Sequence, residues 1–527
     1  MKFVSTYNIC KSIKTRNGFQ RISKQEFLNC YLIHNTFTGN RNVRYYSNTK
    51  ENIQTPEKIK KNIVFNNRTG PSLQHFLSKS INLKSLESGS FIGKAENTAE
   101  QVPYIIENDV VEAKDFDWGE GRTFYVEVYG CQMNVNDTEI LMAILENSGY
   151  KRAISSEKAN IVFLMTCSIR EKAENKIWAR LKEIKAMNKK SKNSTSQMVG
   201  VLGCMAERLK DKLLDNEKLV DVVCGPDAYR SLPRLLSLRK LTNQGVANVI
   251  LSADETYADI SPVRIDPSQI GVHLSIMRGC NNMCSFCVVP FTRGTERSRP
   301  IDSIVDEVTT LSKTGIREVT LLGQNVNSYR DTSDSDISVS LGTGNELSRG
   351  FSTIYKRKEG GRRFSELIDL VARVDPEMRI KFTSPHPKDF PDALLFAIKN
   401  NPNIARNIHL PAQSGSSSVL ERMRRGYTYE SYMELVYRIR EIIPDVTFST
   451  DLIVGFCGET DSEFQQTLEL VKNVGFDMAF MFAYSLREKT HAHRKYKDDV
   501  PATIKNERLQ QLVELFHSIA KEKNKKP

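Results

Sequence analysis

The chain has 527 residues, 39% of them hydrophobic, and a formal net charge of +12. This length and composition allow two or three domains with ordinary globular cores and exclude a chain that is disordered throughout. The longest apolar runs, such as Met478 to Tyr484, are too short to span a bilayer, so we expect no membrane insertion.

The first 50 residues carry most of the positive charge. They contain nine Lys or Arg and a single acid, Glu26, and so contribute +8 of the total. Hydroxyl and apolar residues separate the charges and proline is absent, which is the composition of a mitochondrial presequence; the alternative is a solvated basic tail. Arg44 to Ser47 look like a matrix-peptidase site. We therefore expect residues 1–46 to be a presequence that directs the chain to the mitochondrial matrix.

Residues 47–120 are polar and lack sustained periodicity, which predicts a disordered connector. Residues 121–240 then alternate between strand and helix patterns. Three predicted strands in this region each end at a cysteine that precedes a helix: Arg122 to Val128 before Cys131, Ala159 to Met165 before Cys167, and Met198 to Leu202 before Cys204.

These cysteines predict a shared site, because the carboxyl ends of parallel strands lie at one edge of an α/β sheet. We therefore expect Cys131, Cys167 and Cys204 to converge. A single buried cysteine is ordinarily core filling, and Cys224 and Cys457 are interpreted in that way. Three cysteines at equivalent strand ends instead predict a three-thiolate site for a metal cluster.

The densest cysteine motif follows, with Cys280, Cys284 and Cys287 in Cys-x₃-Cys-x₂-Cys spacing. Three thiolates at this spacing can hold one face of a cubane iron–sulfur cluster and leave one iron open to an outside ligand. A closed zinc site would need a fourth ligand, and the nearest histidine, His273, lies at the far end of a predicted strand. A disulfide framework is disfavoured because three such close cysteines cannot all pair.

Residues 266–500 predict a partial (β/α) barrel with its site at the carboxyl ends of the strands. Six predicted strands alternate with helices: His273 to Arg278, Glu318 to Gly323, Arg379 to Ser384, Ile408 to Leu410, Thr447 to Gly455 and Phe476 to Tyr484. Residues 331–362 are rich in Ser, Asp and Gly and predict an inserted surface loop. Residues 501–527 contain a predicted amphipathic helix, Ile504 to Ala520.

Several of these motifs resemble the radical S-adenosylmethionine (AdoMet) methylthiotransferases, and in particular their MiaB-like branch. The resemblance is carried by Tyr129 to Asn134, Thr166 to Asn175, Gly203 to Arg208, the Cys280 motif with Phe286, Thr383 to Pro387, and His409 to Ser416. It implies an α/β fold, in which an amino-terminal methylthiotransferase domain precedes a partial (β/α)₆ barrel. Members of this family normally continue into a TRAM domain, which we expect to be absent here because no alternating pattern follows the last helix.

The resemblance also implies two 4Fe-4S clusters and AdoMet as cofactors. Cys131, Cys167 and Cys204 would hold one cluster, and Cys280, Cys284 and Cys287 the other. The segment Ile453 to Glu459 is similar to the one that packs against the adenine of AdoMet. Polar or glycine residues at predicted strand ends are candidate cofactor contacts: Ser384, Gln413, Asp451 and Gly455. No catalytic residue is expected beyond the cluster ligands.

The activity implied is conversion of N6-isopentenyladenosine next to the anticodon of tRNA to its 2-methylthio derivative. The partners implied are tRNA and an electron donor that reduces a cluster. One alternative keeps the chemistry and changes the substrate to threonylcarbamoyl-adenosine or a protein side chain. Another is a non-catalytic adaptor that binds a kinase activator, against which the presence of both cysteine motifs argues.

Overall fold

The computed structural model describes residues 119–523 and 525, apart from 169–170, 191–196, 216–218, 243, 253, 255–256, 334–346 and 354–359. The predicted presequence, 1–46, and all but the last two residues of the predicted connector, 47–120, lie outside the described residues. The described residues all belong to one compact unit, 98–527. No helix among them is long and apolar enough to cross a bilayer.

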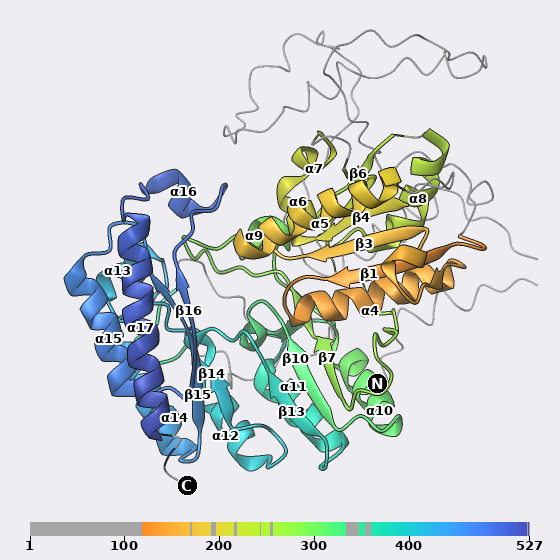
Figure 1. Cartoon of the computed structure of the whole chain (residues 1–527). Helices are drawn as coiled ribbons and strands as arrows, with labels where there is room; N and C mark the ends of the chain where they lie inside the picture. The colour runs from red at the N-terminus through yellow and green to blue at the C-terminus, as the bar shows by residue number, and fades with distance from the viewer. Residues whose placement is uncertain are drawn as a thin grey trace, which may run out of the picture. The chain divides into compact units, whose positions relative to one another are not determined.

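The first part of this unit is built on a six-stranded parallel sheet with the order β2-β1-β3-β4-β5-β6 (Figure 1). Its strands are β1 Thr123–Val128, β2 Lys151–Arg152, β3 Ile161–Thr166, β4 Met198–Gly203, β5 Val222–Cys224 and β6 Val246–Asn248. The three predicted strands correspond to β1, β3 and β4, which are neighbours in the sheet. The sheet also includes β6, which lies beyond residue 240.

Helices cover both faces of this sheet: α4 Gln132–Asn147, α5 Glu171–Lys190, α6 Cys204–Leu209, α7 Asp211–Asp215 and α8 Leu232–Thr242. Successive side chains of a strand point to opposite faces. On β3, Phe163 and Met165 join a core formed with α4 and α8, whereas Val162 and Leu164 join a core formed with α5 and α6. Because it is buried on both faces, β3 is apolar from Ile161 to Met165.

The second part contains the six parallel strands of the predicted partial barrel. They are β7 Gly271–Ser275, β10 Glu318–Leu322, β13 Arg379–Phe382, β14 Asn407–His409, β15 Thr447–Val454 and β16 Met478–Ala483. Two three-stranded ladders, β13-β10-β7 and β14-β15-β16, are joined by a parallel bridge between Ile380 and Ile404. The strands therefore follow chain order in space. No described strand comes after β16 in the chain.

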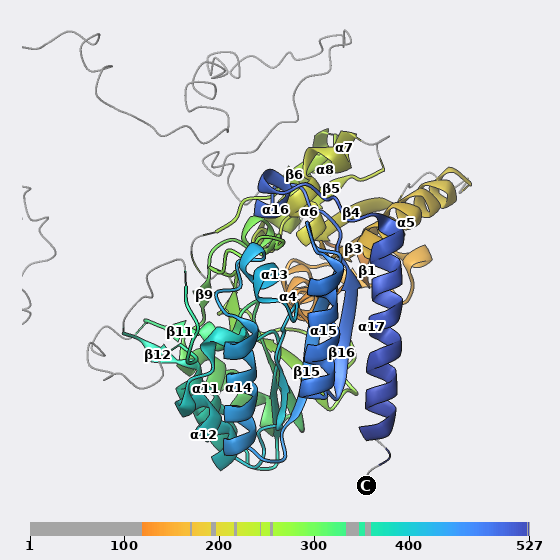
Figure 2. The same ribbon diagram turned by 90° about the vertical axis from the view of Figure 1, so that its left-hand side faces the viewer.

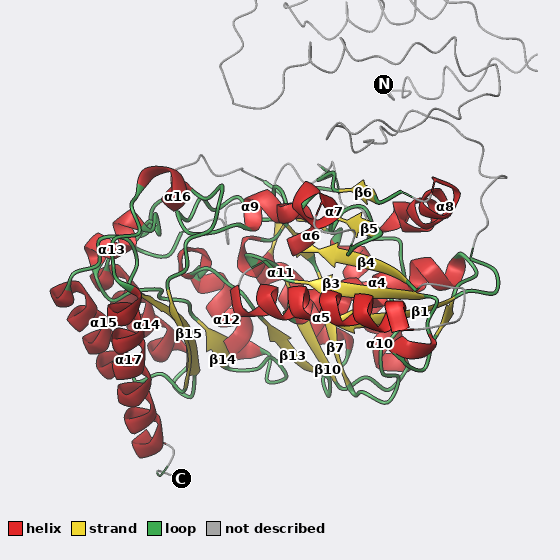
Figure 3. Cartoon of the chain, turned by 45° about the horizontal axis from the view of Figure 1, so that its top comes forward, coloured by secondary structure: helices red, strands yellow, loops and turns green. Residues whose placement is uncertain are grey.

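Helices line this curved sheet, as Figures 2 and 3 show for α11, α12, α14, α15 and α17. The helices are α10 Ile301–Lys313, α11 Phe364–Val374, α12 Asp392–Asn400, α13 Ser417–Arg422, α14 Tyr429–Ile442, α15 Asp461–Val474 and α17 Ala502–Lys523, with short α9 Val289–Thr292 and α16 His491–Lys495. One core unites the strands with helices α10 to α15 and α17, the last through Leu512 and Phe516. The predicted amphipathic helix is confirmed as α17.

Two short antiparallel ribbons complete the second part: β8 Met277–Arg278 with β9 Arg297–Ser298, and β11 Arg330–Asp331 with β12 Arg362–Arg363. The second ribbon closes the base of the insert. Residues 347–353 of the predicted surface loop, 331–362, form no helix or strand, but the loop is not wholly at the surface, because Phe351 is 8% exposed and its ring centroid lies 4.8 Å from that of Tyr427. A single aromatic residue, Phe351, is enough to pack this polar segment against the core.

The two parts of the unit pack closely against each other. Helix α4 covers the edge strand β7, and Asn136 Nδ2 donates to the His273 carbonyl oxygen at 3.0 Å. The buried side chain of Asp227 pairs with Arg297 at 3.0 Å. This contact brings the cysteine-bearing loops of both parts to one region.

Candidate metal and cofactor site

The first cysteine triad, Cys131, Cys167 and Cys204, lies at the carboxyl edge of the first sheet. The parallel register of β1, β3 and β4 aligns Val128 with Met165 and Thr166 with Gly203. The triad members therefore follow the ends of adjacent strands. The thiols of Cys131 and Cys167 form a hydrogen bond, and Cys204 is close enough to interact electrostatically with Cys131.

Two glycines permit this close approach. Gly130 has a φ of +153°, and a Cβ there would lie 2.9 Å from the Cβ of Cys167. Gly203 has a φ of +89°, and a Cβ there would lie 2.6 Å from the carbonyl oxygen of Thr166. Each glycine immediately precedes a triad cysteine. A residue with a side chain would not fit at either position, which explains why glycine stands before Cys131 and Cys204.

The second cysteine triad, Cys280, Cys284 and Cys287, lies on the loop between β8 and α9. At Gly279 the φ is +75°, and a Cβ would lie 2.0 Å from the carbonyl oxygen of Thr295. The Gly279 N–H donates to Gln324 Oε1 at 2.5 Å, and the Asn282 N–H donates to Cys280 Sγ at 3.4 Å. The loop is thus fixed tightly at its first cysteine.

The thiols of each triad influence one another's ionisation. The hydrogen bond with Cys167 and the charge of Arg293 outweigh burial and lower the pKa of Cys131 to about 6. In the second triad, burial and the neighbouring Cys284 raise the pKa of Cys287 to about 12. Metal ligation requires thiolates, so the thiols of the second triad, which oppose one another's ionisation, suit a bound cation that compensates their charge.

Neither triad has the geometry of a mononuclear site. A closed zinc site needs four ligands, usually Cys or His. In the part of the chain that the structure describes, no three His, Cys, Asp or Glu side chains converge closely enough for a single ion. A cubane binds each cysteine through a different iron, and three thiolates are donors that such a cluster takes. The donor chemistry of both triads therefore fits an iron–sulfur cluster.

Each triad also receives a hydrogen bond from a buried arginine. Arg293 Nε donates to Cys204 Sγ at 3.1 Å, and Arg425 Nη1 donates to Cys284 Sγ at 3.3 Å. A guanidinium stabilises an anionic sulfur through its charge and its N–H groups. Sequence reasoning missed both arginines, because their partners lie 89 and 141 residues away in the chain and no local pattern marks them.

Two of the candidate cofactor residues adopt left-handed backbone conformations at strand ends. Ser384, after β13, has a φ of +59°, and Gln413, after β14, has a φ of +70°. Such conformations cost about 1–3 kcal/mol each and cluster at ligand sites. The Gln413 N–H donates to the Asp451 carbonyl oxygen at 2.8 Å, and Asp451 Oδ2 lies 3.2 Å from His409 Nε2. The structure therefore brings Gln413 and Asp451 together.

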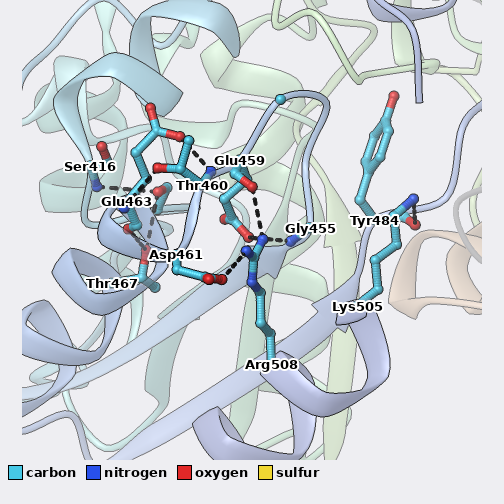
Figure 4. A network of polar contacts seen from close by, with 12 residues as sticks. Ser416, Gly455, Glu459, Thr460, Asp461, Glu463, Thr467, Tyr484, Lys505 and Arg508 are labelled. Atoms are coloured by element: carbon cyan, nitrogen blue, oxygen red, sulfur yellow. Dashed lines mark hydrogen bonds and ion pairs between the residues drawn. The ribbon is translucent and has the colours of Figure 1, made fainter. Parts of the chain in front are cut away.

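Gly455, the fourth candidate, begins a turn that the last helix holds in place (Figure 4). Glu459 Oε2 accepts hydrogen bonds from the Gly455 N–H at 2.6 Å and from Arg508 Nη1 at 3.0 Å. Arg508 Nη2 also donates to Asp461 Oδ1 at 2.5 Å. Lys505 lies over the turn, since a Cβ at Gly455 would be 2.4 Å from Lys505 Cγ. Helix α17 thus fixes the turn Gly455 to Glu459.

A groove of about 530 Å³ adjoins the second triad, and no sequence pattern predicted it. Asn282 and Met283 from the cysteine loop form one wall. Three cationic residues, Lys388, Arg424 and Arg425, line it with a single carboxylate, Glu421. Ser352 and Thr353 of the insert complete its lining. This volume is in the range of small-molecule sites, and the excess of cations favours an anionic ligand.

Comparison with family models matches two regions of the chain. Residues 123–225 match a family described as uncharacterized protein family UPF0004, and residues 274–471 match the radical SAM superfamily. The first region contains the first triad, and the second region contains the second triad and the four candidate cofactor residues.

Comparison with curated proteins finds relatives that are similar over most of the chain. The mitochondrial tRNA methylthiotransferase CDK5RAP1 of Rattus norvegicus is 50% identical over 96% of this chain and 83% of its own length. A CDK5RAP1-like protein of Oryza sativa is 56% identical over 75% of this chain and 67% of its own. The tRNA-2-methylthio-N(6)-dimethylallyladenosine synthase of Chloroherpeton thalassium is 47% identical over 76% of this chain and 81% of its own.

Proposed function

Because the chain belongs to the radical AdoMet methylthiotransferase family, we propose that it is a tRNA methylthiotransferase that converts N6-isopentenyladenosine beside the anticodon to its 2-methylthio derivative. The observation that carries the proposal is the pair of cysteine triads, one in each matched region. C2 of adenine is an unactivated aromatic carbon without useful acidity, so acid–base catalysis alone cannot functionalise it. Radical chemistry meets that need.

Two 4Fe-4S clusters and AdoMet supply the sulfur and radical chemistry when bound. We assign the first triad to one cluster and the second triad to the other, whose open iron is left for AdoMet. Ser384, Gln413, Asp451 and Gly455 are assigned to AdoMet binding. Ser384, Gln413 and Gly455 follow the ends of β13, β14 and β15, whereas Asp451, predicted at a strand end, lies within β15 and accepts a hydrogen bond from the Gln413 N–H. The protein's part is to position these groups and to donate hydrogen bonds to their sulfurs.

The domain assignment follows from these sites. We assign residues 121–240 to the methylthiotransferase domain, 266–500 to the radical AdoMet domain and 501–527 to the carboxyl-terminal helix. The partners are tRNA and a one-electron donor for the cluster of the second triad.

Relatives named as mitochondrial enzymes support a mitochondrial location, and we propose import into the matrix with loss of residues 1–46. Deletion of residues 1–50 should leave a tagged chain in the cytosol; retained mitochondrial signal would contradict this.

The test combines metal analysis with product analysis. Anaerobically prepared protein should contain roughly eight irons per chain, and Cys131→Ala and Cys284→Ala should each lower this to roughly four. Cys224→Ala is the matched control, because Cys224 is a buried cysteine at the end of β5 outside both triads, and it should keep both clusters. Mass spectrometry of tRNA nucleosides should show no 2-methylthio product with Cys284→Ala. A Cys284→Ala chain that still made this product would refute the assignment.

The same nucleoside analysis separates the alternatives. Loss of 2-methylthio-N6-threonylcarbamoyladenosine, with the isopentenyl product intact, would identify the other adenosine substrate. Binding of a kinase activator by a chain without clusters would identify an adaptor. No described feature favours the adaptor, so the enzyme is our conclusion.

A further inference from the structure

Arg293 reaches from the second part of the molecule into the first cysteine triad. Its side chain is 3% exposed, its Nε donates to Cys204 Sγ at 3.1 Å, and its Nη2 lies 2.7 Å from Asp137 Oδ2. The remaining nitrogen, Nη1, is buried and has no hydrogen-bond partner among the described residues. A buried guanidinium donor without an acceptor is costly, so it points to a group that accepts from it when the site is complete.

Asp137 connects the same arginine to the second cysteine loop. This aspartate, on α4, is fully buried, and its Oδ1 lies 2.8 Å from Nη2 of Arg278. Arg278 is 1% exposed, stacks on the Tyr257 ring with its guanidinium carbon 4.7 Å from the centroid, and stands two residues before Cys280. One carboxylate therefore holds two arginines, one of which contacts the first triad and the other of which leads into the second.

The charge of this cluster indicates what it faces. Asp137 contributes one negative charge, whereas Arg278 and Arg293 contribute two positive charges, so the buried group is net cationic. Burial opposes ionisation of Asp137, but the two arginines outweigh it and lower its pKa. Ion pairs of this kind add little net stability over apolar side chains. The excess positive charge instead matches an anionic group beside Cys204, namely the thiolates and the cluster that they hold.

This inference rests on the proposed function. We propose that Arg293 is a positioning residue for the cluster of the first triad. It orients Cys204, and it raises the reduction potential of that cluster by stabilising the reduced form, which is the more negative one. Hydrogen bonds to cluster sulfurs and nearby charge are established determinants of such potentials. Asp137 fixes the guanidinium in place, and Arg278 fixes Asp137. In the described residues, the hydrogen bond of Arg293 goes to a sulfur of the first triad, and the corresponding donor to the second triad is Arg425.

The test is a redox titration of the full chain with both clusters bound, monitored by electron paramagnetic resonance. The Cys284→Ala chain, which should hold only the first-triad cluster, identifies the signal of that cluster. Arg293→Met should move the midpoint potential of the first-triad cluster to a more negative value and leave the other potential unchanged. Arg293→Lys, which keeps the charge and loses the guanidinium geometry, should give a smaller shift in the same direction.

Arg297→Met is the matched control. Arg297 is also a buried arginine paired with one aspartate, Asp227, but it contacts no cysteine sulfur among the described residues. It should leave both potentials at their wild-type values. A wild-type midpoint in Arg293→Met, or an equal shift in Arg297→Met, would overturn the inference. If Arg293→Met loses the cluster, Arg293→Lys decides by the same criterion. A wild-type chain with only four irons would contradict the proposed function instead.

Discussion

Glu207, on α6, has a buried carboxyl group with a partner for only one of its two oxygens. Its side chain is 3% exposed, Lys210 Nζ lies 3.2 Å from its Oε1, and its Oε2 has no hydrogen-bond partner among the described residues. Burial outweighs the charge of Lys210 and raises the pKa of Glu207 from 4.5 to about 7. Between these values the native state holds a proton that the unfolded state has lost, so stability falls as pH rises through this window.

We expect Glu207→Gln to remove this part of the pH dependence. Between about pH 4.5 and 7, the free energy of unfolding of the wild type should decline more steeply than that of the variant, by up to about 1.4 kcal/mol per pH unit. Urea unfolding at several pH values in this window measures the difference. Glu183→Gln, at a side chain that is 60% exposed, should keep the wild-type slope. Parallel profiles for the wild type and Glu207→Gln would assign the dependence to other groups.

The cysteines were predictable at the residue scale, and the arginines around them were not. Cys131 and Cys204 each follow a glycine at the end of an apolar strand, so local pattern marks them. Arg293 and Arg425 owe their importance to contacts made only in three dimensions. Arginine is frequent in this chain and is usually found at surfaces, so no sequence pattern separates a buried donor to sulfur from a solvated charge.

Helix α17 provides a test at the scale of one element. Arg508→Met should leave the carboxylate of Glu459 buried and without its cationic partner, which typically costs about 3–5 kcal/mol of unfolding free energy. Under the proposed function, in which Gly455 contacts AdoMet, it should also raise the KM for AdoMet, because Arg508 holds the turn that begins at Gly455. Denaturant unfolding and initial rates at varied AdoMet concentration measure the two effects.

Lys523→Met is the control on the same helix. Lys523 pairs with Asp477 at 2.7 Å, but its side chain is 40% exposed. It is the last residue of α17, whereas the contacts with the turn come from the first part of the helix. The loss should stay below about 1 kcal/mol with an unchanged KM for AdoMet. Equal losses in the two variants would show that α17 stabilises the fold generally and has no particular role at the turn.

The elements themselves were largely predictable, because apolar alternation and Gly or Pro punctuation are local signals. All six strands of the partial barrel and the amphipathic α17 appear in the structure at the expected places. The ribbons β8-β9 and β11-β12 were missed, since two-residue strands carry no periodicity. The packing of Phe351 on Tyr427 was missed because one aromatic residue in a polar insert does not reveal its partner.

At the scale of the whole molecule, we expect the radical domain to depend on the first domain for its solubility. A chain of residues 266–527 alone would uncover the edge of β7 that α4 covers and remove Asp137 and Asp227 from buried Arg278 and Arg297. Exposed strand edges and unpaired buried charges favour aggregation. Expression of this chain should give insoluble protein, and co-expression of residues 119–265 should restore soluble protein. A soluble 266–527 chain with a cooperative unfolding transition would contradict this.

Asp137 has one more consequence for catalysis under the proposed function. Through Arg293 and Arg278 it ties the loops of both cysteine triads to a single buried carboxylate, so the protein cannot easily change the separation between them. The nucleic acid must then provide the motion. Enzymes that modify a base commonly turn it out of its stack into a pocket, at a cost of a few kcal/mol. On this rigid frame, the target adenine is the part that must swing out of the anticodon loop to meet the sulfur and the radical at fixed positions.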